Sequence, residues 1–191
     1  MVNASQVIVL GGSGMLAGVC LSLMQAGNTM TVVARDRDKL ARLRDKGNGR
    51  SGKIVPVAVD YSHTDELVRA LEKAIGEHGN VSAIVSWIHN HSRKLLISII
   101  DLIGNDSDPP EFFDILGSDA ANPQSAEDDV SIALKHRRDI RYYRIILGFK
   151  ITSTGSRWLT DEEICDGVLK AMHTRNTVTI VGVVEPSDRK P

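Results

Sequence analysis

A run of small residues, Gly11-Gly12-Ser13-Gly14, stands between an apolar segment at residues 7–10 and a helical pattern that begins near residue 15. Glycine has no β-carbon, so the backbone N–H groups of such a turn can approach an anion closely. The helix that follows directs the positive end of its dipole to the same place. A strand, a glycine-rich turn and a helix in this order are typical of a dinucleotide-binding unit.

The spacing Gly12-x-Gly14-x-x-Ala17 fits the dinucleotide fingerprint, with Ala17 where the helix packs against the strand. A turn that merely connects strand and helix is the alternative. The strand, the helix and the repeat of this pattern that follows favour the binding turn. The residues expected to contact the dinucleotide here are Gly11, Gly12, Ser13, Gly14, Met15 and Leu16.

Short β-branched segments alternate with amphipathic segments along almost the whole chain. The expected strands are residues 6–10, 30–34, 53–59, 83–87, 112–116, 142–149 and 177–183. The expected helices are residues 15–25, 38–46 and 63–78, a modest candidate at 126–136, and a last helix opened by the capping box at 160–163. This alternation predicts an α/β fold, a Rossmann-type doubly wound and mainly parallel sheet of about seven strands with helices on both faces.

Length and composition narrow the class of protein. The chain has 191 residues, which fits one domain over 1–191, and its net charge of -1 gives no indication of a nucleic-acid-binding surface. It has no apolar run near the roughly 20 residues of a membrane helix and no secretory start, and Cys20 and Cys165 are expected in helix cores. We therefore expect a cytoplasmic protein that binds a small molecule and does not bind nucleic acid or membrane. The sequence leaves its oligomeric state open, a homo-oligomer included.

These features resemble the short-chain dehydrogenase/reductases, particularly their atypical members. Gly11, Gly14 and Ala17 match the family spacing G-x-x-G-x-x-G or A, and the resemblance continues through residues 31–36, 57–61 and 84–87. It implies an NAD(P)-dependent oxidoreductase. The family motif Y-x-x-x-K, which supplies the general acid, is missing here, so the helix between the fifth and sixth strands is expected to be shortened or replaced.

The end of the second strand decides which dinucleotide is favoured. Arg35 stands there, and a guanidinium can grip a 2′-phosphate bidentately, so NADP(H) is preferred, while Asp36 leaves NAD(H) open. The resemblance implies that Asp60, after the third strand, meets the adenine ring, with Tyr61 at the border of the same pocket. The alternative for Asp60 is a cap on the next helix.

The remaining candidates follow later strands. The resemblance implies that Ser118 hydrogen-bonds a substrate carbonyl and that Thr152, spaced from Gly148 as in the family, meets the nicotinamide amide. His89 follows the fourth strand and is the candidate proton donor.

Other side chains in this region have structural interpretations. Tyr142 and Tyr143 are interpreted as packing residues, and Lys150 as a solvated lysine or a replacement cation. No metal site is expected, because the histidines near residue 90 lack further ligands at a suitable spacing.

Two function classes stay open at this point. The first is an NADP(H)-dependent oxidoreductase acting on a small carbonyl or imine. The second is a catalytically inactive NAD(P)-binding sensor or regulatory module, since fold does not fix function.

Overall fold

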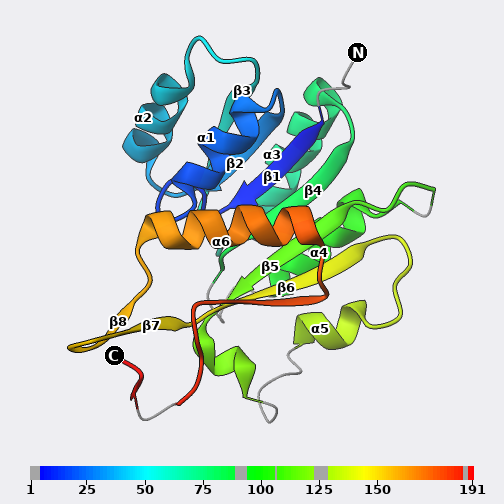
Figure 1. Cartoon of the computed structure of the whole chain (residues 1–191). Coiled ribbons are helices and arrows are strands. Elements are labelled where there is room, and N and C mark those ends of the chain that lie inside the picture. Colours follow the sequence, from blue (N-terminus) through cyan, green and yellow to red (C-terminus); the bar gives the residue numbers. More distant parts are fainter. Residues whose placement is uncertain (1–4, 89–93, 106, 123–128, 187–188) are drawn as a thin grey trace.

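A parallel sheet organises the chain in a computed structural model that describes residues 5–88, 94–105, 107–122, 129–186 and 189–191 (Figure 1). Seven strands lie in the order β3-β2-β1-β4-β5-β6-β9, and every neighbouring pair is parallel. They are β1 (Gln6–Leu10), β2 (Thr29–Ala34), β3 (Lys53–Ala58), β4 (Val81–Ser86), β5 (Glu111–Leu116), β6 (Arg141–Leu147) and β9 (Val178–Val181). The strand order reverses between β1 and β4, which is where ligands bind in open sheets of this kind.

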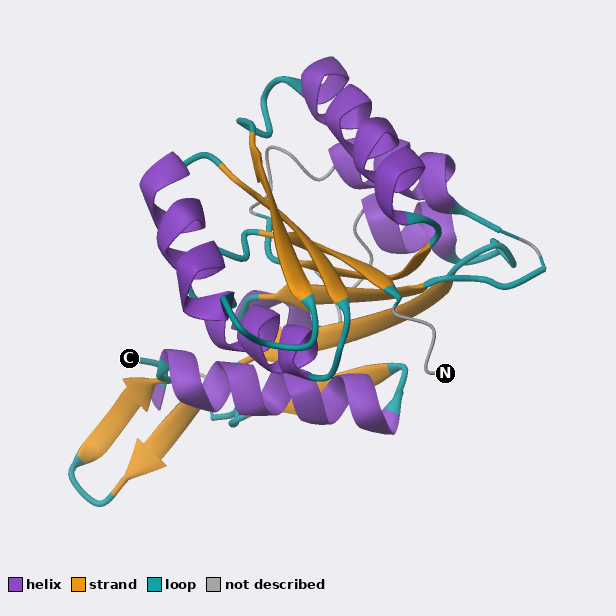
Figure 2. Ribbon diagram, turned by 90° about the horizontal axis from the view of Figure 1, so that it is seen from above, coloured by secondary structure: helices purple, strands orange, loops and turns teal. Residues whose placement is uncertain are grey.

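Helices cover both faces of this sheet (Figure 2). One face carries α1 (Ala17–Gln25), α2 (Arg37–Gly47) and α6 (Asp161–Thr174). The opposite face carries α3 (Thr64–His78), α4 (Lys94–Ile103) and α5 (Asp129–Leu134). The central strands β1 and β2 are buried along their whole length because both faces are covered, which explains their continuous apolar sequence. The predicted fold class, a doubly wound sheet of about seven strands, is confirmed.

The sequence prediction was wrong in one strand. Residues 142–149 do not form a single strand: β6 ends at Leu147, and the chain continues into a separate antiparallel hairpin of β7 (Phe149–Thr152) and β8 (Gly155–Trp158). A β-carbon on Gly148 would lie 2.0 Å from the carbonyl oxygen of Val183. Phe149 also exchanges backbone hydrogen bonds with Val183. The chain leaves the sheet where residues 148–149 meet Val183.

The helices agree with the sequence except at α4 and α5. The capping box is present, since the Thr160 hydroxyl accepts from the Glu163 N–H and the Glu163 carboxylate accepts from the Thr160 N–H. Helix α4 was not anticipated, and α5 has only six residues within the broader segment expected to be helical. Cys20 and Cys165 are buried in α1 and α6, as expected. Among the described residues, no helix is both long and apolar enough to cross a membrane.

Candidate functional site

The glycine-rich turn follows the end of β1, and each of its three glycines has a different physical explanation. Gly11 adopts φ +82°, and a β-carbon there would lie 2.8 Å from the Trp87 carbonyl oxygen. A β-carbon on Gly12 would lie within 3.0 Å of core atoms of Val9, Val32 and Cys20. Gly14 is exposed, and a β-carbon there would meet no atom within 4 Å. Gly14 is therefore the open position of the turn, where a ligand can approach the backbone.

The N-terminal end of α1 has no side-chain cap. Its N-cap is Leu16, which makes no side-chain capping hydrogen bond, and the first turn contains no acidic residue. Leu16 buries its side chain in the core, so it can offer a ligand only its backbone, whereas Ser13 and Met15 are half-buried. An uncapped helix N-terminus with no carboxylate in its own first turn suits an anion such as a pyrophosphate.

Arg35 and Asp36 follow β2 at the same edge of the sheet. The Arg35 side chain is 73% exposed, and its guanidinium lies 3.8 Å from the carboxylate of Asp60. Asp36 is the N-cap of α2 and accepts a hydrogen bond of 2.9 Å from the Lys39 N–H, which holds the pKa of Asp36 below its usual value. Arg35 is thus available to a ligand, while Asp36 is engaged in capping.

Asp60 and Tyr61 both stabilise the local backbone through hydrogen bonds. Asp60 accepts from the Ser62 N–H at 2.9 Å and the Ser62 hydroxyl at 2.8 Å, which lowers the pKa of Asp60 and fixes the turn before α3. The Tyr61 hydroxyl donates to the Val33 carbonyl at 3.0 Å, and the Gly11 N–H donates to the same carbonyl at 3.1 Å. Tyr61 therefore braces the glycine turn against the end of β2. Whether either residue also meets an adenine ring stays a prediction.

The candidates of the substrate side lie at the ends of later strands. Ser118 is half-buried at the start of a short 3-10 helix, η2 (Ser118–Ala121), which follows β5 directly. Thr152 lies exposed at the end of β7, where its hydroxyl donates to the Gly155 carbonyl at 3.1 Å. His89 lies outside the described residues. The structure therefore keeps Ser118 near the carboxyl end of the sheet and engages Thr152 within the hairpin turn.

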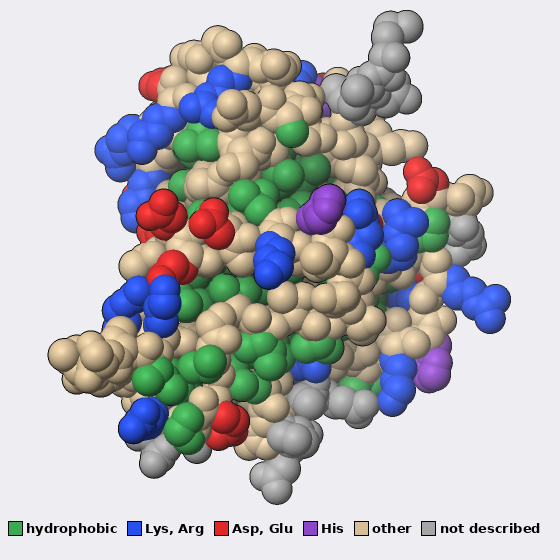
Figure 3. Space-filling model, in the orientation of Figure 1, with side chains coloured by type: hydrophobic (Ala, Val, Ile, Leu, Met, Phe, Trp, Pro, Cys, Tyr) green, Lys and Arg blue, Asp and Glu red, His purple; other side chains and the backbone are tan. Residues whose placement is uncertain are grey.

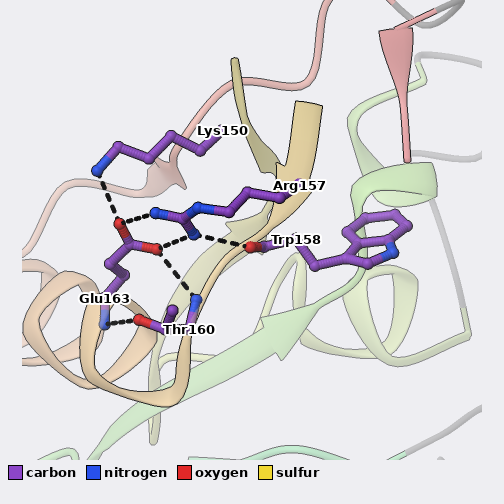
Figure 4. Close-up of polar contacts among 5 residues, drawn as sticks. All are labelled: Lys150, Arg157, Trp158, Thr160 and Glu163. Carbon is purple, nitrogen blue, oxygen red and sulfur yellow. Dashed lines mark hydrogen bonds and ion pairs between the residues drawn. The ribbon is translucent and has the colours of Figure 1, made fainter. Parts of the chain in front are cut away.

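The hairpin is attached to α6 through Glu163 (Figure 4). The Glu163 carboxylate accepts from Lys150 Nζ at 2.7 Å and from both terminal nitrogens of Arg157 at 2.8 and 2.9 Å. These hydrogen bonds, the one from Arg157 foremost, hold the pKa of Glu163 well below its usual range. Lys150 is therefore a solvent-exposed lysine, 55% exposed, that is paired with Glu163.

Sequence reasoning missed a buried polar group on β5. Asp114 is fully buried, and the Tyr142 hydroxyl donates to its carboxylate at 2.8 Å. Tyr142 and Tyr143 do pack, as predicted, against Phe112 and Phe113. The missed signal was an aspartate within the apolar run of residues 112–116, since a charged side chain in a buried strand needs a partner.

An acidic cavity borders the glycine turn. A cavity of about 320 Å³ lies between α1 and α6 and is lined by Gly14, Met15, Ala17, Gly18, Ser22, Asp161, Glu162, Cys165, Asp166 and Leu169. Figure 3 shows acidic side chains at the start of α6 and basic side chains over α2. Three carboxylates line this cavity, Asp161, Glu162 and Asp166, and they oppose an anionic ligand there. Among the described residues, no group of three His, Cys, Asp or Glu side chains could hold a metal ion.

A family model described as short chain dehydrogenase matches residues 5–89, which include the glycine turn, Arg35 and Asp60. Residues 5–89 are thus similar to the short-chain dehydrogenase family. A curated short chain dehydrogenase of Pseudocercospora fijiensis (strain CIRAD86) is 30% identical over 80 residues, which are 42% of this chain and 26% of that protein. This chain therefore matches about a quarter of the length of that relative.

Solved structures of short-chain dehydrogenases and of one further oxidoreductase share the fold over almost the whole chain. A metagenomic short-chain oxidoreductase in complex with NADP has a TM-score of 0.68 at 16% identity, covering 95% of this chain and 97% of its own. A variant of a Serratia marcescens short-chain dehydrogenase/reductase has a TM-score of 0.72 at 16% identity, covering 93% and 96%. A putative D-mannonate oxidoreductase from Haemophilus influenza with bound NAD has a TM-score of 0.67 at 10% identity, covering 95% and 94%. At these identities the likeness shows the fold.

Proposed function

We propose that this chain is an NADP(H)-dependent oxidoreductase of short-chain dehydrogenase type that acts on a small carbonyl or imine. The observation that carries the proposal is the exposed Arg35 beside a glycine turn that is open at Gly14 and lies against an uncapped helix N-terminus. A cation, the backbone of an open glycine turn and the helix dipole complement a dinucleotide that bears an additional phosphate.

Different residues of this chain would hold different parts of the cofactor. Gly14 and the start of α1 would hold the pyrophosphate, and Arg35 would pair with the 2′-phosphate of the adenosine ribose. Asp36 is the residue that would accept a hydrogen bond from the 2′-hydroxyl of NAD(H), but its carboxylate already caps α2. This engagement supports NADP(H) as the preferred cofactor while leaving NAD(H) open.

NADP(H), when bound, supplies or accepts a hydride, and the protein provides orientation and polarisation. Ser118, after β5, would donate a hydrogen bond to the substrate oxygen or nitrogen. His89, after β4, would be the proton donor. Thr152 would contact the nicotinamide amide. The partner is a small molecule; a homo-oligomer and a cytoplasmic location belong to the same proposal.

Calorimetric titration of NADPH and NADH tests the cofactor assignment. Arg35→Ala should lose on the order of 1.5–3 kcal/mol in NADPH affinity, the range for hydrogen bonds to charged groups, and little in NADH affinity. Arg42→Ala, an exposed cation of α2, is the matched control and should change neither affinity. Equal losses for both cofactors in Arg35→Ala would contradict the assignment.

Gly14→Val tests the pyrophosphate position separately. The new side chain meets open space in the folded protein, so we expect a folded variant that no longer binds either cofactor. Gly12 is unsuitable for this purpose because its β-carbon would collide with the core. Unchanged NADPH affinity in a folded Gly14→Val protein would place the cradle elsewhere.

A nucleotide-binding sensor is the second candidate, and one observation favours it. The sequence has no Y-x-x-x-K, and α5, between β5 and β6, has only six residues. A positioned proton donor typically contributes about 10²–10⁴-fold to rate, so ordinary ketones should react slowly without it. A panel of carbonyl and imine compounds with NADPH separates the two functions, since tight NADPH binding without turnover of any compound would favour the sensor. Strong reduction unaffected by His89→Gln would exclude His89 as the donor.

A further inference from the structure

The cavity between α1 and α6 has two unlike walls. The α1 wall carries no charged side chain and consists of Gly14, Met15, Ala17, Gly18 and Ser22. The α6 wall carries the carboxylates of Asp161, Glu162 and Asp166, and no lysine, arginine or histidine of the described residues lines the cavity. Its volume of about 320 Å³ lies at the lower end of the range for small-molecule sites, about 300–1,000 Å³. A small ligand fits this cavity, and the charge of the α6 wall favours a cation.

The three carboxylates are not neutralised by the described part of the chain. Glu163, in the same helix, is paired with two cations of the hairpin. Asp161, Glu162 and Asp166 are exposed, and among the described residues no lysine or arginine forms an ion pair with them. A cationic ligand would reduce the repulsion between these like charges, whereas the protein does not.

The two helices meet at one point of the cavity. A β-carbon on Gly18 would lie 2.8 Å from Cys165 Sγ, and the Cys165 thiol donates to the Met15 carbonyl at 3.2 Å. Gly14, which precedes these residues in the turn, has open space where a β-carbon would lie. A ligand in the cavity is therefore adjacent to the position proposed for the cofactor.

The packing of α6 assigns the cavity to one half of the sheet. Helix α6 packs against α1, β6 and β9, and β6 and β9 lie on the opposite side of β1 from β2. Arg35, which follows β2, is the residue proposed for the 2′-phosphate. The reacting end of the cofactor would therefore point away from Arg35, to the half of the sheet that α6 covers.

A missing proton donor restricts the substrates that such surroundings suit. The sequence has no Y-x-x-x-K, the motif of the general acid. Reduction of a neutral carbonyl produces an anionic oxygen unless a donor protonates it, and three nearby carboxylates disfavour that anion. A protonated imine already carries its proton. Its positive charge passes to the oxidised cofactor, so the site holds the same net charge before and after the reaction.

We propose that the cavity binds the substrate as a cation, and that this substrate is a small protonated imine. The inference rests on the proposed function. The iminium carbon accepts the hydride with its electron pair, and the π electrons of the C=N bond become the lone pair of the amine nitrogen. No proton is taken up or released in this step. Asp161, Glu162 and Asp166 hold the cation through their charge.

Titration without cofactor tests the cavity directly. The probe is N-methyl dihydroisoquinolinium, a small iminium ion with a permanent charge. We expect the wild type to bind it, and the triple variant Asp161→Asn, Glu162→Gln, Asp166→Asn to bind it about tenfold more weakly, because each exposed charge contributes modestly. Tetralone, a neutral ketone of similar size, should bind both proteins equally. Glu72→Gln, an exposed position of α3 on the other face of the sheet, is the control and should change neither affinity.

Equal affinity of the iminium for the wild type and a folded triple variant would overturn the proposal. The variant keeps Glu163 and thus the capping box of α6, and its melting temperature shows whether it folds. If it does not fold, salt replaces it, since about 0.5 M sodium chloride should weaken binding of the iminium to the wild type and leave tetralone unaffected. Binding of the iminium that is independent of salt would likewise overturn the proposal.

Turnover with NADPH provides the second measurement. The wild type should reduce the iminium with a kcat that is constant between pH 6 and 8, and should reduce tetralone at least about 10²-fold more slowly. In the triple variant the KM of the iminium should rise about tenfold while NADPH affinity does not fall, because removing negative charge beside the turn does not weaken an anion. A loss of both affinities, or faster reduction of tetralone, would overturn the proposal. Wild type that binds no NADPH defeats the proposed function instead, while titration with the iminium still decides the role of the cavity.

Discussion

A single carbonyl shows how side chains distant in sequence shape the glycine turn. The Val33 carbonyl accepts from the Gly11 N–H and from the Tyr61 hydroxyl, so three segments meet at one oxygen. Burial raises the pKa of Tyr61 to about 12, so the phenol keeps its proton and donates throughout the neutral range. The adenine pocket that the sequence suggested for Tyr61 is a separate role from this hydrogen bond.

Removal of this hydroxyl gives the first prediction. Tyr61→Phe keeps the ring and deletes one hydrogen bond, so the free energy of unfolding should fall by about 0.5–1.5 kcal/mol. For a chain of this length, this corresponds to a loss of about 1–6 °C in the melting temperature. Thermal unfolding measures the change, and NADPH titration shows whether it reaches the site. A variant as stable as the wild type would mean that the Val33 carbonyl does not need its second donor.

At the scale of the element, the hairpin β7–β8 depends on one carboxylate. Glu163 belongs to α6, closes the capping box with Thr160, and accepts from Lys150 and Arg157 of the hairpin. Because the folded pKa of Glu163 is lower than the unfolded one, its stabilisation is complete above the unfolded value of about 4.3. It is lost as pH falls from there through the lower folded pKa.

Glu163→Gln should therefore be less stable than the wild type at pH 7, and the difference should narrow as pH falls below about 4.3, because the unfolded carboxylate then becomes protonated. Melting temperatures of both proteins at pH 7, 5, 4 and 3 measure this convergence. Glu162→Gln, one residue earlier in the same helical turn, is the control and should run parallel to the wild type. A stability difference between Glu163→Gln and the wild type that is constant with pH would contradict this account.

The elements also show what the sequence could and could not predict. The parallel strands were predictable because burial on both faces requires continuous apolar runs such as Ile8–Leu10 and Val32–Ala34. The hairpin was not, because the break at Gly148 is caused by Val183, which lies 35 residues later in the printed sequence. The contact between Asp114 and Tyr142 was likewise not predictable, because it depends on the register between β5 and β6.

At the scale of the whole molecule, the proposed cofactor site combines residues that follow three strands distant from one another in the sequence. The glycine turn follows β1, Arg35 follows β2, and Trp87 follows β4. The Trp87 carbonyl lies against Gly11, so the crevice is held by contacts between strands and not within one segment. A ligand bound here contacts only the folded state and must stabilise the protein as a unit.

The last prediction measures this linkage. NADPH at 100 times its dissociation constant should raise the free energy of unfolding by about 2.7 kcal/mol. For a chain of this length this corresponds to a rise of about 5–11 °C in the melting temperature. NADH at the same concentration should produce a smaller rise, and Gly14→Val should produce none with either cofactor. Hydrogen exchange would locate the effect, with slower exchange at residues 11–18 and 33–36 and no change in the hairpin at 149–158, whose anchor is Glu163. Protection confined to the hairpin would mean that the ligand binds outside the crevice.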